Sequence, residues 1–157
     1  MSTKYNAINT IVLMSVVGLL TCCGKSGELT PAPELTFEEQ LQSQLIQAKP
    51  GDVINIPAGT HEITRSLSLD VPGVTIRGAG SDQSILSFKN QVQGAEGLLV
   101  TADDFIIEDL AIEDTVGDAL KINESSNVTI RRVRTEWTNG PDSDNGAYGI
   151  YPVQSRN

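Results

Sequence analysis

The sequence predicts an all-β fold: a right-handed parallel β-helix with one N-terminal capping α-helix, spanning residues 36–157. Three observations lead to this prediction. A segment repeats along the chain, the connections are too short to hold crossover helices, and each repeat has a turn-forming residue at the same place. The whole chain has 157 residues, enough for one domain with a substantial core.

The repeat consists of two short alternating strands joined by a bend. Its copies begin at Leu67, Leu98 and Leu120, and a fourth begins at Tyr151. Each complete copy is followed by a third apolar segment, at residues 85–88, 110–112 and 133–135. One copy cannot bury its apolar face alone, so we expect parallel turns of three strands each, with the three leucines in one interior file. The alternative is a β-sandwich, which would require hairpins.

The bends and the charges support stacking. The bend positions hold residue types that tolerate left-handed backbone angles, namely Gly73, Asp104, Asn127 and Asn157. Stacking also aligns Arg77, Glu108 and Arg131 in one column of alternating charge, and it places Asp109 beside Arg132. We therefore expect a ladder of opposite charges on the outer surface.

A single helix is predicted before the repeats. Thr36 and Glu39 have the spacing of a capping box, and Pro50-Gly51 ends the helix. The apolar stripe of this helix is formed by Phe37, Leu41, Leu45 and Ala48.

The N-terminus has the pattern of an export signal. One lysine precedes the ten-residue apolar run 11–20, which is too short to span a membrane. The following Leu20-Thr-Cys-Cys23 resembles the lipobox of bacterial lipoproteins. The resemblance implies a signal peptide over 1–22, fatty-acid modification (palmitate) of Cys23, with Cys22 as the alternative, and a flexible tether over 23–35. Gly24 after Cys23 implies a lipid-anchored protein of the bacterial cell envelope, on the periplasmic or surface face of the outer membrane.

Two further stretches carry a resemblance to a superfamily. The segment Ala48-Lys-Pro-Gly-Asp-Val-Ile-Asn-Ile-Pro-Ala-Gly-Thr60 after the helix, and then Val74-Thr-Ile-Arg-Gly-Ala-Gly80, resemble the opening of pectate-lyase-like parallel β-helix proteins. The superfamily includes polysaccharide lyases, uronan epimerases and adhesins. Within it the chain is most similar to bacterial β-helix-repeat lipoproteins, which implies a carbohydrate ligand and an enzymatic or a purely binding role.

The charge balance limits the partners. The chain has 11 Lys and Arg against 20 Asp and Glu, for a net charge of −9. A nucleic-acid binder needs a basic face, so nucleic acid is not an expected partner. An acidic polysaccharide would also be repelled unless Ca²⁺ intervened.

Lys121 and Arg134 are the candidate catalytic residues, because a lyase or epimerase must neutralise a uronate carboxylate and remove a neighbouring proton. Arg131 and Arg132 could serve the same chemistry, but they also fit the ladder of surface charges.

The loop 136–149 holds the candidate ligand-binding residues. Trp137 and Tyr148 could stack on sugar rings, and Asp142 and Asp144 could hold Ca²⁺. Their spacing does not match an EF-hand loop, so no metal site is assigned; a polar turn is the alternative interpretation.

These observations favour an envelope-anchored, carbohydrate-binding lipoprotein over the alternative, a lyase or epimerase of acidic polysaccharide. The helix would cap one end of the stack, and the sequence stops within a turn at Asn157. We therefore expect the chain to be an N-terminal fragment with further turns after it.

Overall fold

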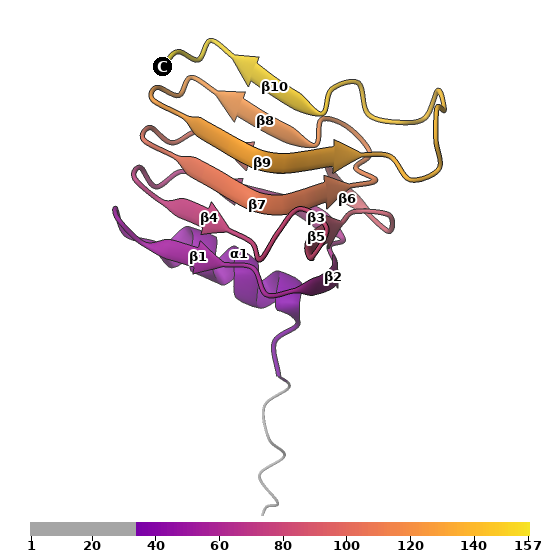
Figure 1. Cartoon of the computed structure of the whole chain (residues 1–157), viewed down its shortest axis with the longest axis horizontal. Coiled ribbons are helices and arrows are strands. Elements are labelled where there is room, and N and C mark those ends of the chain that lie inside the picture. Colours follow the sequence, from indigo (N-terminus) through magenta and orange to yellow (C-terminus); the bar gives the residue numbers. More distant parts are fainter. Residues whose placement is uncertain (1–33) are drawn as a thin grey trace, which may run out of the picture. The chain divides into compact units, whose positions relative to one another are not determined.

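The computed structural model describes residues 34–157, which form one helix and ten strands (Figure 1). The export segment, Cys22, Cys23 and most of the tether lie outside these residues. The elements are α1 (Phe37–Gln47), β1 (Val53–Asn55), β2 (Gly59–Glu62), β3 (Arg65–Leu69), β4 (Thr75–Arg77), β5 (Ser84–Ser87), β6 (Gln93–Val100), β7 (Ile106–Glu113), β8 (Leu120–Asn123), β9 (Thr129–Glu136) and β10 (Ile150–Val153).

The strands form two separate sheets, and every strand pair within them is parallel. The six-stranded sheet has the order β1-β4-β7-β5-β2, with β9 also paired to β7. The four-stranded sheet has the order β10-β8-β6-β3. Figure 1 shows β7 and β9 as long curved strands, with β8 and β10 behind and above them.

The predicted fold class, an all-β right-handed parallel β-helix with three strands per turn, is wrong. The fold is mixed: one helix with two distinct sheets, and the expected third strand is a separate element, β5, only in the first turn. In β7 and β9 the second and third predicted strands are joined into one. The join lies at Asp109 and Arg132, whose φ angles are 61° and 52°. A single left-handed residue bends the strand there, and ladder pairing continues on both sides, so no loop divides it.

The predicted stacking of the repeats is confirmed for the first three copies. Leu67 pairs with Leu98, and Leu98 pairs with Leu120; all three side chains are buried. The fourth copy was predicted one residue out of register, because Ile150 and not Tyr151 lies opposite Leu120. Successive side chains of a strand point to opposite faces, so this shift turns Tyr151 away from the interior file.

Three of the four predicted bend positions adopt the left-handed backbone that their residue types tolerate. Gly73, Asp104 and Asn127 have φ angles of 72°, 56° and 57°, whereas Asn157 does not have a positive φ. Hydrogen bonds link successive bends, and the Asn127 side-chain amide donates to the Asp104 carboxylate at 2.6 Å. Equivalent bends therefore stack as the strands do.

Helix α1 packs against β2 and β3 at one end of the sheets and buries Leu41 and Leu45. Its predicted capping box is confirmed, with the Thr36 hydroxyl accepting from the Glu39 amide. The Glu38 carboxylate accepts from both the amide and the hydroxyl of Thr64, at 3.0 and 2.8 Å. These bonds fix the helix across the strand ends.

At the opposite end, β9 and β10 are edge strands. An open pocket there is lined by side chains that include Ile122, Val128, Ile130 and Ile150. Within residues 34–157, no helix is both long enough and apolar enough to cross a membrane.

Candidate functional site

The outer face of the four-stranded sheet carries the candidate residue Lys121. The register places Ser68, Leu99, Lys121 and Tyr151 in one file, each residue on the strand next to the last. Their neighbours Leu67, Leu98 and Leu120 point into the core, so alternation directs this file outward. Lys121 and Tyr151 therefore share a surface.

Tyr148 joins this surface from the loop before β10. Its ring stacks on that of Tyr151, with centroids 4.5 Å apart and an interplanar angle of 17°. The Tyr148 carbonyl accepts from the Ala119 amide at 2.9 Å, which ties the loop to the start of β8. A side chain at Gly149 would lie 2.3 Å from the Thr135 hydroxyl, so the loop can pass there only with glycine.

Lys121 lies between the tyrosines and two carboxylates. Its Nζ is 5.9 Å from the Tyr151 ring centroid, 3.0 Å from Glu96 Oε1 and 4.0 Å from Asp118 Oδ2. The five residues Tyr148, Tyr151, Lys121, Glu96 and Asp118 are called the tyrosine platform below.

The charges of the platform are mutually stabilised. The hydrogen bond to Glu96 raises the pKa of Lys121, and the same bond lowers the pKa of Glu96. Lys121 is therefore held in its protonated form at neutral pH. A protonated amine cannot accept a proton from a substrate, so this geometry does not suit Lys121 as a general base.

Arg134, the second candidate catalytic residue, lies in a different cluster, on β9. Its guanidinium contacts Glu113 at 2.7 Å and Asp82 at 3.4 Å, and it also bonds Glu136. Burial by itself lowers the pKa of Arg134, but the bonds to Glu113 and Glu136 outweigh this and raise it. Three carboxylates thus surround this arginine, and it is not poised to neutralise a substrate carboxylate.

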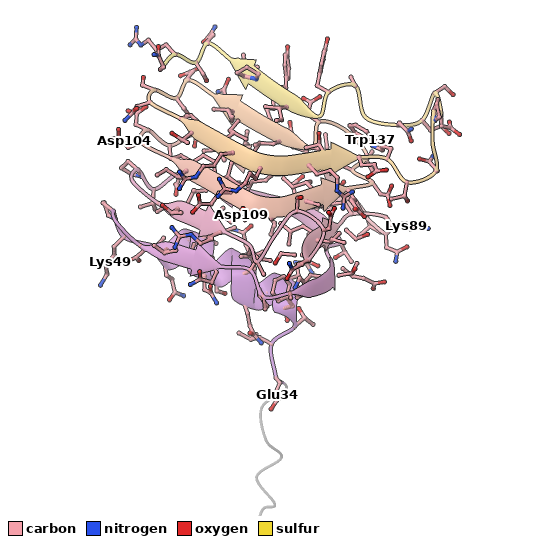
Figure 2. The ribbon with its side chains drawn as sticks, in the orientation of Figure 1. Glu34, Lys49, Lys89, Asp104, Asp109 and Trp137 are labelled. Atoms are coloured by element: carbon pink, nitrogen blue, oxygen red, sulfur yellow. The ribbon has the colours of Figure 1, made fainter. Side chains whose placement is uncertain are left out.

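Trp137 lines a groove of about 220 Å³ that also includes Lys89, Thr115 and Asp144. Trp137 and Lys89 lie toward the same end of the molecule (Figure 2). The indole N–H donates to the Thr115 carbonyl at 2.7 Å, and the ring packs partly against the core. A side chain at Gly146 would lie 2.8 Å from the indole. Trp137 therefore anchors the loop, and it belongs to a different cluster from Tyr148.

Asp142 and Asp144 shape the turn between these clusters. The Asp142 carboxylate accepts from the Asp144 amide at 3.0 Å, and the Asn145 side chain donates to the Gly140 carbonyl at 2.7 Å. In the part of the chain that the structure covers, no three His, Cys, Asp or Glu side chains are grouped so as to hold a metal ion.

The sequence prediction missed Tyr151 and Glu96 as members of the site. The sequence predicts that the fourth repeat begins at Tyr151, whereas Ile150, which has the more apolar side chain, lies opposite Leu120. Glu96 lies in the nonrepeating first half of β6, two residues before the repeat begins at Leu98. Only its contact with Lys121 places it in the platform.

Comparisons with known proteins add no assignment: no protein-family model matches the chain, and no match is found among curated proteins or solved structures. The arrangement of the site is therefore the basis for a functional proposal.

Proposed function

We propose that the protein is a carbohydrate-binding module that holds a neutral glycan on the tyrosine platform. The observation that carries this proposal is the stacked pair of Tyr148 and Tyr151 on an outer sheet face, with Tyr148 52% exposed. Tyrosine offers a large, rigid and amphipathic contact area at low conformational cost. The apolar C–H face of a sugar ring can pack on such a surface.

The polar members of the platform suit the hydroxyl groups of a sugar. Lys121 donates hydrogen bonds, and Glu96 and Asp118 accept them, all beside the aromatic pair. Charge-assisted bonds of this kind are stronger than neutral ones and would orient the ring. Aromatic surface with a few convergent polar groups is typical of small-ligand sites.

The charge of the platform favours a neutral ligand. One lysine and two carboxylates give it a formal charge of −1, on a chain whose net charge is −9. A polyuronate would be repelled by this potential. The pairing of Lys121 with Glu96 also favours binding over proton abstraction, which argues against a lyase or epimerase.

The test is a glycan array probed with the purified full-length chain, followed by calorimetry with the best ligand. We expect Tyr148→Ala to weaken binding at least tenfold and Tyr148→Phe to retain most of it, because the ring provides the contact. Val92→Ala is the matched control, since Val92 is 84% exposed but outside the platform. Failure of every neutral glycan to bind, or equal loss in the control, would refute the proposal. Binding of a protein partner but of no glycan would also refute the proposal.

We also propose that the protein is attached to the bacterial envelope through a fatty acid on Cys23. The support is the export-like segment 1–22 and the lipobox-like sequence that ends at Cys23. Metabolic labelling with an alkyne-tagged fatty acid tests this in a bacterial host. We expect Cys23→Ser to abolish labelling and Cys22→Ser, the matched control, to retain it. The reverse pattern would assign the modification to Cys22, and labelling of both variants would refute attachment at a single cysteine.

A further inference from the structure

A group of arginines on the six-stranded sheet forms a second charged surface. The predicted column of alternating charge is confirmed, because Arg77, Glu108 and Arg131 are paired across β4, β7 and β9. Arg77 Nε lies 2.5 Å from Glu108 Oε1, and Arg131 Nε bonds Glu108 Oε2. Arg132 Nε and Nη2 bond the two Asp109 oxygens at 2.6 and 2.8 Å. These five residues are called the arginine cluster below.

The three guanidinium groups gather around the Glu108 carboxylate. Arg132 Nη2 is 3.7 Å from Glu108 Oε2, so all three arginines have a nitrogen within 4 Å of the same carboxylate. Asp109, which follows Glu108 in the chain and bonds Arg132, is labelled in Figure 2. The hydrogen bond from Arg131, followed by that from Arg77, lowers the pKa of Glu108, which is therefore ionised at neutral pH.

The cluster retains an excess of positive charge. Three arginines and two carboxylates leave a formal charge of +1, although the chain as a whole carries −9. In contrast, Lys121 and Arg134 each lie among more carboxylates than cations. A local positive surface on an acidic protein attracts anions to that one place.

The arginines also present unused donors to solvent. The side chains of Arg77, Arg131 and Arg132 are 46, 52 and 60% exposed, whereas that of Glu108 is only 2% exposed. Arg77 and Arg131 engage Glu108 through Nε, and no hydrogen bond within residues 34–157 uses their Nη groups. The carboxylates therefore hold each guanidinium in place while its outer donors remain available. Such preorganisation reduces the ordering cost of binding a ligand.

We infer that the arginine cluster binds a tetrahedral oxyanion, the phosphate group of a phosphomonoester. The outer donors of three guanidinium groups held around one carboxylate can serve the three terminal oxygens of such a group. A single carboxylate has only two oxygens, and one arginine fork already satisfies it. The cluster lies on the other sheet from the tyrosine platform, so this inference is independent of glycan binding there.

Three titrations of the full-length chain distinguish the possible sources of the phosphate. The probes are inorganic phosphate, glucose 6-phosphate, and phosphatidylcholine vesicles with and without phosphatidic acid, all at constant ionic strength. NMR signals of the arginine Nε–H groups report binding to the soluble probes, and co-sedimentation reports binding to vesicles. We expect saturable shifts with a Kd on the order of 1 mM for inorganic phosphate. Tighter binding of either glucose 6-phosphate or the acidic vesicles identifies a soluble or a lipid-borne phosphate.

Matched variants decide whether the cluster is the site. We expect Arg131→Gln and Arg132→Gln each to weaken phosphate binding at least tenfold. Arg65→Gln should leave it unchanged, because Arg65 is 62% exposed and ion-paired with Glu38 outside the cluster. Circular dichroism verifies that each variant is folded.

Two outcomes would overturn the inference. One is the absence of saturable binding to all three probes by the unmodified chain, which would leave the arginines as a ladder of ion pairs only. The other is an equal loss of affinity in the cluster variants and in Arg65→Gln, which would indicate nonspecific attraction to positive charge. Neither outcome bears on the neutral glycans that test the tyrosine platform.

Discussion

Replacing Leu98 by alanine tests the register on which both surfaces depend. Leu98 is 1% exposed and lies in the interior file between Leu67 and Leu120. Truncating a fully buried leucine removes its transfer free energy and leaves a cavity, which together cost about 3–4 kcal/mol. Because β6 is paired on both sides, its neighbours have little freedom to fill the space.

The adjacent Leu99 provides a matched control with the same chemical change. It lies in the outward file beside Lys121 and is only partly buried. We expect Leu99→Ala to cost about 1 kcal/mol, because folding removes less of the apolar surface of Leu99 from water than of the buried Leu98. The two variants should therefore differ by about 2–3 kcal/mol in the free energy of unfolding.

Urea unfolding of the full-length chain measures this difference, with the fluorescence of Trp137 as the probe, the one tryptophan in the sequence. Thermal unfolding should show a Tm about 10 °C lower for Leu98→Ala than for the unmodified chain. If Leu99→Ala cost as much as Leu98→Ala, the inward and outward files would be wrongly assigned. The assignment of Lys121 and Tyr151 to one outer surface would then also be wrong.

Three further predictions concern stability. Bonding to Arg131 lowers the pKa of Glu108, so the ionised carboxylate stabilises the fold above the unfolded pKa of about 4.3. This stabilisation is lost as pH falls through the lower pKa of the folded state. The Tm measured from pH 7 to 3 should therefore decline over this range, and decline less in Glu108→Gln. Gly117→Ala should destabilise the fold strongly, because its Cβ would lie 2.2 Å from the Ala95 carbonyl oxygen, and calorimetry should show a lower Tm. Thr36→Ala removes the helix cap and should cost about 1 kcal/mol in urea unfolding; an unchanged midpoint would argue against the cap.

The two charged surfaces have different chemistry on the same framework. The tyrosine platform combines aromatic rings with a carboxylate excess, and the arginine cluster has a cation excess. In both surfaces, parallel stacking places equivalent outward positions of successive repeats next to each other, such as Lys121 beside Tyr151 and Glu108 beside Arg131. Side chains more than 20 positions apart in the sequence thus become neighbours, as with Arg131 and Glu108.

Local pattern was sufficient to predict several parts of the protein. The capping box at Thr36, the stacking of Leu67 on Leu98, and the charge column through Glu108 all follow from spacing and residue type, and all are confirmed. The capping box depends on two positions three residues apart in the chain, and the other two features depend on positions that the repeat relates. A repeat shows which residues are equivalent, and equivalence in a parallel stack means adjacency.

Tertiary structure alone decided the sheet architecture and the membership of the site. Whether Asp109 ends a strand or bends it depends on hydrogen bonds to the strands on either side, so the merging of two expected strands into β7 was not visible in the sequence. The same holds for Tyr151, whose face depends on a register set by the loop before it, and for Glu96, which reaches Lys121 from a nonrepeating segment. Residue type and period determine which side chains can share a face, whereas insertions and backbone pairing determine which ones meet.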